Sequence, residues 1–277
     1  MKYNYSIILP YRDKYDLFTT AINSVPDRED IQIIIVDNAP QSLSKVPKKN
    51  KAAVTYVTSS PTKGAGCARN IGLQYVEGKY LLFLDADDYF TASAFNTFDK
   101  YLCEEYDIVF FCADSIKLST GLRSGRHEHI VKNIKDYLQT KEEGLLRYGI
   151  VNPIAKMFKT EFIFNNNILF DETRVSNDVW FSMRTGHLAN QVTANREVVY
   201  MITEGDNGSS LTTSLNKDNW FIRFQVMVKV NKFLKEVNAY KYHTRLTGFL
   251  RVAWKEFGFK EFLRFLKYAV DNRVSVF

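Results

Sequence analysis

Three carboxylates stand directly after an apolar run, at a spacing suited to binding a cation. Residues 80–84 are apolar, and Asp85, Asp87 and Asp88 follow them. Acids this close together repel one another unless a cation lies between them. A divalent cation such as Mn²⁺ or Mg²⁺, bound by carboxylate oxygens, would remove that repulsion, and such cations often carry phosphate. The alternative is that Asp87 or Asp88 caps a following helix, and this stretch alone favours neither interpretation.

The apolar run before these acids is typical of a strand that is buried on both faces of a parallel sheet. Because a buried strand cannot easily carry charge, the acids must lie just past its end. Further strands are predicted at 5–9, 31–36, 53–57 and 108–112, with helices at 13–24 and 92–102 and a loop passing into a helix at 63–72. This alternation predicts an α/β fold, with a mostly parallel central sheet and helices on both faces.

Polar residues follow three of the predicted strands, and the topology brings those strand ends to one edge of the sheet. The three endings are Tyr11-Arg12, Asp37 and the acids at 85–88. Asp37 could be a turn residue, but at the end of a buried strand on this edge we interpret it as accepting a hydrogen bond from a ribose or a base. The edge is therefore the expected ligand site.

The glycines at 64, 66 and 72 do not follow the G-x-G-x-x-G dinucleotide fingerprint. An ordinary loop and helix start is one interpretation of this segment. The other is that Lys63 and Arg69 place positive charge beside a phosphate site.

Taken together, these segments resemble inverting family 2 glycosyltransferases of the GT-A fold, of the kind that builds bacterial polysaccharides. The resemblance rests on residues 6–11, 33–38, 63–72 and 82–88, in that order and spacing. It implies that Asp87 and Asp85 bind the divalent metal. It implies donor contacts from Pro10, Tyr11, Asp37, Lys63, Gly64, Arg69, Asp85 and Ala86.

A second block extends the resemblance to the acceptor side. Residues 152–159 resemble the segment that leads there, and residues 176–181 resemble the family's Glu-Asp motif, whose second acid is the expected catalytic base. That acid is Asp178 here, although a role as a helix N-cap is the alternative. Asn177 replaces the usual Glu, and we expect its amide to donate to Asp178 and lower the pKa of that carboxyl.

Two further features qualify the resemblance. Arg12 stands where Asn is common in the family, and residues 205–210 resemble the loop that closes over the donor diphosphate.

The resemblance implies that a sugar moves from a nucleotide sugar, with a UDP-sugar favoured, to a saccharide or lipid-linked saccharide acceptor. Transfer would proceed with inversion, by one metal-assisted displacement. The alternative is a related α/β nucleotide-binding protein, either a nucleotidyltransferase or a non-catalytic binder of nucleotide sugars. A nucleotidyltransferase would carry a glycine- and arginine-rich loop after the first strand. Residues 10–14 contain no glycine, which favours sugar transfer.

The sequence divides into two parts by pattern and charge. We expect a GT-A catalytic domain over 1–215, with a nucleotide-sugar-binding half at 1–115 and an acceptor-side half at 116–215, followed by a basic helical segment over 216–277. The net charge is +6, and residues 217–277 alone carry +8. The basicity therefore belongs to the C-terminal segment.

Lys260, Arg264, Lys267 and Asp271 line one face of a helix predicted over 259–271. This face is either solvated or attached to an anionic membrane surface. Nucleic acid is not an expected partner, because no recognition motif accompanies the charge.

The expected location is the cytoplasm, with peripheral contact at the inner face of the membrane as a further expectation. Three cysteines do not form a disulfide framework and favour a reducing compartment. No stretch approaches about 18 uninterrupted apolar residues. The first residues run directly into a predicted strand, which leaves no room for a signal peptide.

Overall fold

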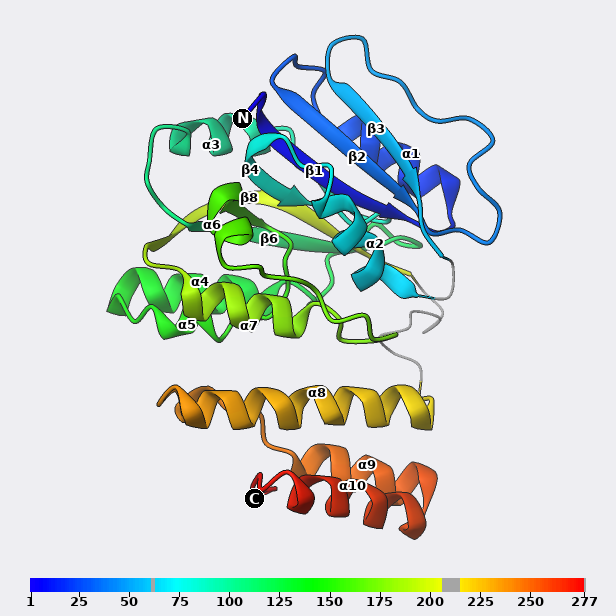
Figure 1. Cartoon of the computed structure of the whole chain (residues 1–277), viewed down its shortest axis with the longest axis vertical. Helices are drawn as coiled ribbons and strands as arrows, with labels where there is room; N and C mark the ends of the chain where they lie inside the picture. The colour runs from blue at the N-terminus through cyan, green and yellow to red at the C-terminus, as the bar shows by residue number, and fades with distance from the viewer. Residues whose placement is uncertain (61–62, 206–214, 277) are drawn as a thin grey trace.

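A computed structural model describes residues 1–60, 63–205 and 215–276, and its centre is one eight-stranded sheet (Figure 1). The strands are β1 (Tyr3–Tyr11), β2 (Ile31–Asp37), β3 (Ala53–Thr58), β4 (Gly78–Phe83), β5 (Tyr89–Phe90), β6 (Ile108–Lys117), β7 (Lys156–Lys159) and β8 (Val192–Glu204). Their order across the sheet is β3-β2-β1-β4-β7-β6-β8-β5. Most neighbours are parallel, but β7 is antiparallel to β4 and β6, and β5 is antiparallel to β8.

The parallel half of the sheet positions the ligand site. Every residue of β2 is buried, as expected for a strand covered on both faces. The step from β1 to β2 and the step from β3 to β4 run in opposite directions across the sheet. Right-handed crossovers then place α1 (Tyr15–Ser24) and α2 (Gly64–Leu73) on opposite faces (Figure 1). The order reverses between β1 and β4, so a ligand crevice should open beyond their carboxyl ends.

The remaining helices of the α/β part are α3 (Ala94–Phe98), the 3₁₀ helix η1 (Asp99–Tyr101), α4 (Glu128–Thr140), α5 (Gly144–Arg147), α6 (Thr160–Asn165) and α7 (Val179–Leu188). The helix expected over 92–102 is therefore a short α-helix followed by a 3₁₀ turn. Its N-cap is Ser93, and β5 separates it from the acids. The capping interpretation of Asp87 and Asp88 is thus wrong.

The C-terminal segment is helical, as expected. Helix α8 (Lys217–Glu236) lies between the α/β part and a hairpin of α9 (Thr247–Phe257) and α10 (Phe259–Asp271), with the 3₁₀ turn η2 (Tyr240–Tyr242) before the hairpin (Figure 1). One apolar cluster joins α8 to the hairpin and includes Phe224, Leu250 and Phe265. A second joins α8 to α7 through Val226, Val230, Val179 and Met183. The segment thus has a small core of its own and a fixed attachment to α7. Among the described residues, no helix is both long enough and apolar enough to span a membrane.

Candidate active site

A cleft of about 930 Å³ opens where the strand order reverses. Its walls come from the ends of β1 and β2, the start of α2, the turn after β4 and the start of α7, and α8 contributes one residue. The expected site residues that line it are Pro10, Tyr11, Gly64, Arg69, Asp85 and Asp178. The cleft therefore joins the ends of the parallel strands to the segment that carries the expected base.

Arg69 is the residue that connects the two sides of the cleft. It is buried, and its Nη2 donates to Asp85 Oδ1 at 2.6 Å while its Nη1 donates to Asn177 Oδ1 at 3.0 Å. Its guanidinium carbon lies 5.3 Å from the centre of the Phe170 ring. Within the described residues, its buried Nε has no hydrogen-bond partner. One buried cation thus fixes the turn after β4 against the start of α7.

The glycine-bearing segment lets α2 approach the segment before α7. A Cβ at Gly66 would lie 2.1 Å from the carbonyl oxygen of Asp171 and 2.9 Å from Asn177 Cβ, so no larger residue fits there. One turn further on, the Asn70 amide donates to the Phe170 carbonyl at 3.0 Å and accepts from the Phe170 N–H at 2.8 Å. These contacts hold Arg69 against the segment before α7.

Asp178 occupies the N-cap position of α7, but its side chain accepts no capping hydrogen bond from the helix. Burial raises the pKa of Asp178, Asp85 adds to this effect by repulsion, and the charges of Arg69 and Lys156 oppose it. Asn177 does not act as expected. Its Oδ1 accepts from Arg69, and its Nδ2 donates to the Thr173 carbonyl at 3.3 Å. Because the Asn177 amide is engaged by Arg69 and Thr173, the expected hydrogen bond from Asn177 to Asp178 is wrong, and burial leaves the pKa of Asp178 raised.

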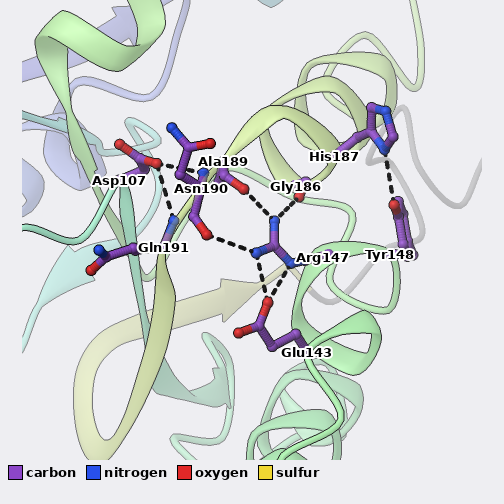
Figure 2. A network of polar contacts seen from close by, with 9 residues as sticks. All are labelled: Asp107, Glu143, Arg147, Tyr148, Gly186, His187, Ala189, Asn190 and Gln191. Carbon is purple, nitrogen blue, oxygen red and sulfur yellow. Dashed lines mark hydrogen bonds and ion pairs between the residues drawn. The ribbon is translucent and has the colours of Figure 1, made fainter.

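The far end of α7 is held by a polar network (Figure 2). Arg147 donates to the carbonyls of Gly186 at 2.8 Å, Ala189 at 2.6 Å and Asn190 at 3.4 Å. A Cβ at Gly186 would lie only 2.0 Å from the Arg147 carbonyl oxygen. The Asp107 carboxylate accepts from the Asn190 N–H at 2.6 Å. A positive charge at a helix C-terminus also interacts favourably with the negative end of the helix dipole. The network therefore fixes the orientation of α7 and, with it, the position of Asp178.

We expect Arg147→Met to lower the free energy of unfolding by about 2–4 kcal/mol, since the carbonyls that end α7 lose a charged donor. Urea denaturation measures this value. Lys132→Met is the matched control, because it removes the same kind of charge from the exposed i,i+4 pair with Asp136. That change should alter stability by less than about 0.5 kcal/mol. Equal effects from the two substitutions would show that Arg147 does not anchor α7.

The three acids after β4 have different surroundings. The Asp85 N–H donates to the Tyr200 hydroxyl at 3.0 Å. Asp88 is buried, and its Oδ1 accepts from the Thr203 N–H at 2.8 Å, so it ties the acidic turn to β8. Burial, followed by the charges of Asp85 and Asp87, holds the pKa of Asp88 well above its usual range. Asp87 is exposed over the residue as a whole, and its carboxylate forms no hydrogen bond or ion pair with any other described residue.

Asp85 and Asp87 fit a divalent cation that also binds phosphate. Among the described residues, no three His, Cys, Asp or Glu side chains form a metal cluster. Mg²⁺-type sites for nucleotides commonly use one or two carboxylates, with substrate phosphates and water completing the shell. Desolvation of the carboxyl group and repulsion from Asp85 raise the pKa of Asp87. A cation bound nearby would lower this pKa again, because it favours the ionised carboxylate. The pair is therefore suited to a metal that arrives with its nucleotide.

Asp37 does not line the cleft. It is buried beneath the loop after β2, where its carboxylate accepts from the N–H groups of Ala39 at 2.9 Å and Leu43 at 2.8 Å and from the Tyr56 hydroxyl at 2.6 Å. Its neighbour Asn38 lines the cleft instead. Asp37 thus holds in place the loop that contains Asn38. We had expected Asp37 itself to contact the nucleoside.

Two other expected residues lie outside the lining of the cleft. Ala86 packs against the main core, Lys63 is exposed and lies 3.9 Å from Glu172, and neither is among the residues that line the cleft. Residues 206–210 of the loop expected to cover the diphosphate lie outside the described residues.

Several cleft residues were given no role from the sequence. Arginines from four separate segments line it, namely Arg12, Arg126, Arg174 and Arg223. Lys156 is buried and does not line the cleft. Its Nζ donates to the Ile150 carbonyl at 2.8 Å and lies 4.8 Å from the centre of the Phe110 ring. Burial lowers the pKa of Lys156 to about 7. The sequence carries no local signal that these side chains converge, except that Arg12 departs from the family pattern.

The sequence is similar to teichoic-acid proteins. Residues 6–164, more than half of the chain, match glycosyl transferase family 2. Poly(ribitol-phosphate) beta-N-acetylglucosaminyltransferase TarS of Staphylococcus aureus is 24% identical over 224 residues, which are 76% of this chain and 38% of TarS. Minor teichoic acid biosynthesis protein GgaB of Bacillus subtilis is 25% identical over 238 residues, which are 79% of this chain and 25% of GgaB. The chain thus spans well under half the length of either relative.

Solved structures show the same fold. TarS 1–349 in complex with UDP-GlcNAc has a TM-score of 0.70 at 18% identity, and the match covers 97% of this chain and 81% of that chain. The mannosyltransferase PcManGT from Pyrobaculum calidifontis, in complex with GDP-Man and Mn²⁺, has a TM-score of 0.55 at 13% identity, over 99% and 82% of the two chains. The expected GT-A fold is confirmed, and the chain belongs to glycosyl transferase family 2.

Proposed function

We propose that the chain transfers a sugar from a UDP-sugar to a hydroxyl group of a phosphate-bearing polymer, with inversion at the anomeric carbon. The observation that carries this proposal is the Arg69 bridge, which holds Asp85 and the start of α7 in one cleft. A donor diphosphate near Asp85 and an acceptor hydroxyl near Asp178 would then meet in that cleft. Family membership and the UDP-GlcNAc bound by TarS support a UDP-sugar donor.

The chemistry is a single displacement. The acceptor oxygen forms a bond to the anomeric carbon as the bond from that carbon to the diphosphate oxygen breaks, and the electron pair leaves with UDP. Asp178 takes the acceptor proton. Gly64 and Ala65 line the cleft at the start of α2, and the free backbone N–H groups of a helix N-terminus favour an anion there. Inversion follows because one displacement occurs without an enzyme nucleophile.

Asp87 and Asp85 are the residues that would hold a divalent cation. When bound there, Mn²⁺ or Mg²⁺ would neutralise charge on the departing diphosphate. Arg69, fixed by Asp85 and Asn177, adds a permanent positive charge on the same side of the cleft.

The charge of the cleft supports an anionic acceptor. Arg12, Arg126 and Arg174 are exposed side chains on its walls, in addition to the buried Arg69. Guanidinium groups pair well with phosphate. A bound metal would neutralise part of the negative charge of the donor diphosphate, so the diphosphate needs only some of these arginines. The remainder suits a polymer such as the poly(ribitol phosphate) named for TarS, and salt should then weaken acceptor binding.

The test is an incubation of the protein with UDP-GlcNAc or UDP-glucose, with and without Mn²⁺, and with poly(ribitol phosphate) or a neutral oligosaccharide as acceptor. We expect metal-dependent release of UDP that the phosphate polymer stimulates, and NMR should show an inverted anomeric configuration. Retention of configuration would overturn the displacement scheme. Donor binding without any turnover would instead support the non-catalytic alternative.

The pH profile tests the assignment of the base. The rate should fall as pH drops through the raised pKa of Asp178, because a protonated carboxyl cannot accept the acceptor proton. Asn177→Glu adds a negative charge beside Asp178 and neutralises Arg69, and both changes raise the pKa of Asp178 further. We therefore expect the acidic limb of the rate profile to move to higher pH in this variant. Asn177→Gln, which adds no charge, should leave it in place, and a shift to lower pH with Glu would contradict the assignment.

A further inference from the structure

The α9–α10 hairpin lies at the end of the molecule farthest from the sheet (Figure 1). Several of its large apolar side chains are exposed to solvent. The exposed fractions are 58% for Trp254, 58% for Phe259, 45% for Leu263 and 64% for Val270. Single exposed apolar residues are ordinary on protein surfaces, whereas a contiguous group marks an interaction site. The ring centres of Trp254 and Phe259 lie 6.2 Å apart, and the other two residues share the side of α10 that carries Phe259, so the four form one face.

The apolar face is continuous along α10. Phe259, Leu263, Leu266 and Val270 recur at intervals of three and four residues, which places them on one side of the helix. At the hairpin turn, the Phe262 ring lies 5.3 Å from Trp254 and 5.9 Å from Phe259, measured between ring centres. A groove of about 610 Å³ continues the face between the two helices, lined by Leu250, Trp254, Phe262 and Leu266 among others.

Basic side chains border this apolar face on both sides. On α10, Lys260 and Lys267 come directly after Phe259 and Leu266 of the apolar face. On α9, Arg251 and Lys255 line the groove. Among the described residues, none of these four forms an ion pair. Arg264 differs, since it pairs with Glu261 at 3.1 Å and its guanidinium carbon lies 3.8 Å from the Phe221 ring centre. The hairpin therefore combines exposed aromatic and aliphatic side chains with unpaired positive charge.

We propose that this face docks on an anionic lipid surface, with α9 and α10 lying in the plane of the interface. An apolar stripe containing Trp and Phe, flanked by Lys and Arg, is the pattern that interfacial helices share. Anionic headgroups complement the basic borders. A second copy of the chain is a poorer occupant, because a two-fold contact would bring the same basic borders of two copies together. The docking does not depend on sugar transfer.

The test is sedimentation of the whole protein with vesicles of phosphatidylglycerol and phosphatidylcholine, or of phosphatidylcholine alone, at low and at physiological salt. We expect binding to the anionic vesicles only, weaker at higher salt. Lys260→Glu with Lys267→Glu should weaken that binding at least about tenfold, since each basic residue contributes about fivefold or more near an anionic surface. Lys45→Glu with Lys48→Glu makes the same charge change on an exposed loop elsewhere and should have a much smaller effect.

The apolar part is tested separately. Phe259→Ser should also weaken vesicle binding, whereas Leu122→Ser, at another exposed apolar residue, should not. Tryptophan emission should shift to the blue on binding, and Trp254→Phe should remove most of that shift while binding persists. The proposal is overturned if the wild type fails to bind anionic vesicles at low salt. It is equally overturned if Phe259→Ser leaves vesicle binding intact and instead abolishes a concentration-dependent dimer seen by analytical ultracentrifugation.

Discussion

The Asp178→Asn variant is expected to lose at least about a hundredfold in turnover, because general-base catalysis typically contributes 10²–10⁴-fold. The amide keeps the size of the carboxyl group but cannot accept the acceptor proton. Affinity for the UDP-sugar should stay close to that of the wild type, since the base acts on the acceptor. Stopped assays of UDP release and calorimetric titration of the donor measure the two quantities separately.

Asp171→Asn is the matched control for this variant. Asp171 lies shortly before α7 and pairs with Lys229 at 3.0 Å, but it does not line the cleft. It undergoes the same chemical change seven positions away, and transfer should remain close to that of the wild type. Retained transfer in Asp178→Asn, or a collapse of donor affinity in that variant, would show that the base lies elsewhere.

The parallel half of the sheet could be predicted because its strands are continuous apolar runs. Strands β1, β2 and β4 are buried on both faces, and such runs stand out from their polar endings. Strand β7 has only four residues, and β8 contains the polar sequence Asn195-Arg196-Glu197 in its middle. Neither one has a clear period, so only their pairing with neighbouring strands identifies them.

The site could be predicted in part. Topology and resemblance together brought Tyr11, Arg69, Asp85 and Asp178 to one edge, and the cleft includes all four. The roles of individual polar groups could not be predicted in the same way, because hydrogen-bond partners depend on packing. Asn177 shows this directly, since its amide turns to Arg69 and Thr173.

The same limit explains the arginines of the cleft. Arg126, Arg174 and Arg223 lie in separate segments, and no spacing in the sequence relates them to one another. Asp37 was expected to contact the nucleoside, but the loop that follows it occupies its carboxylate.

Asp87→Asn is the second change with a large expected effect. It removes one negative ligand and keeps the shape of the side chain, and we expect metal-dependent turnover to fall at least about a hundredfold, because a Lewis-acid metal contributes several kcal/mol at the developing charge. Binding of Mn²⁺ in the presence of UDP, measured by calorimetry, should weaken in parallel. Circular dichroism should show an unchanged fold, since the Asp87 carboxylate forms no hydrogen bond or ion pair with another described residue.

Asp88→Asn is the matched control for Asp87→Asn, because it is the same substitution one residue away. The pKa of Asp88 is held well above its usual range by burial and by its two acidic neighbours. A group whose folded-state pKa is raised destabilises the folded protein once pH exceeds its unfolded pKa, so a neutral Asn at 88 should leave the melting temperature unchanged or raise it. Its amide oxygen can still accept from the Thr203 N–H. Mn²⁺ binding and transfer should therefore persist in Asp88→Asn and fail in Asp87→Asn, and the reverse pattern would assign the metal ligand to Asp88.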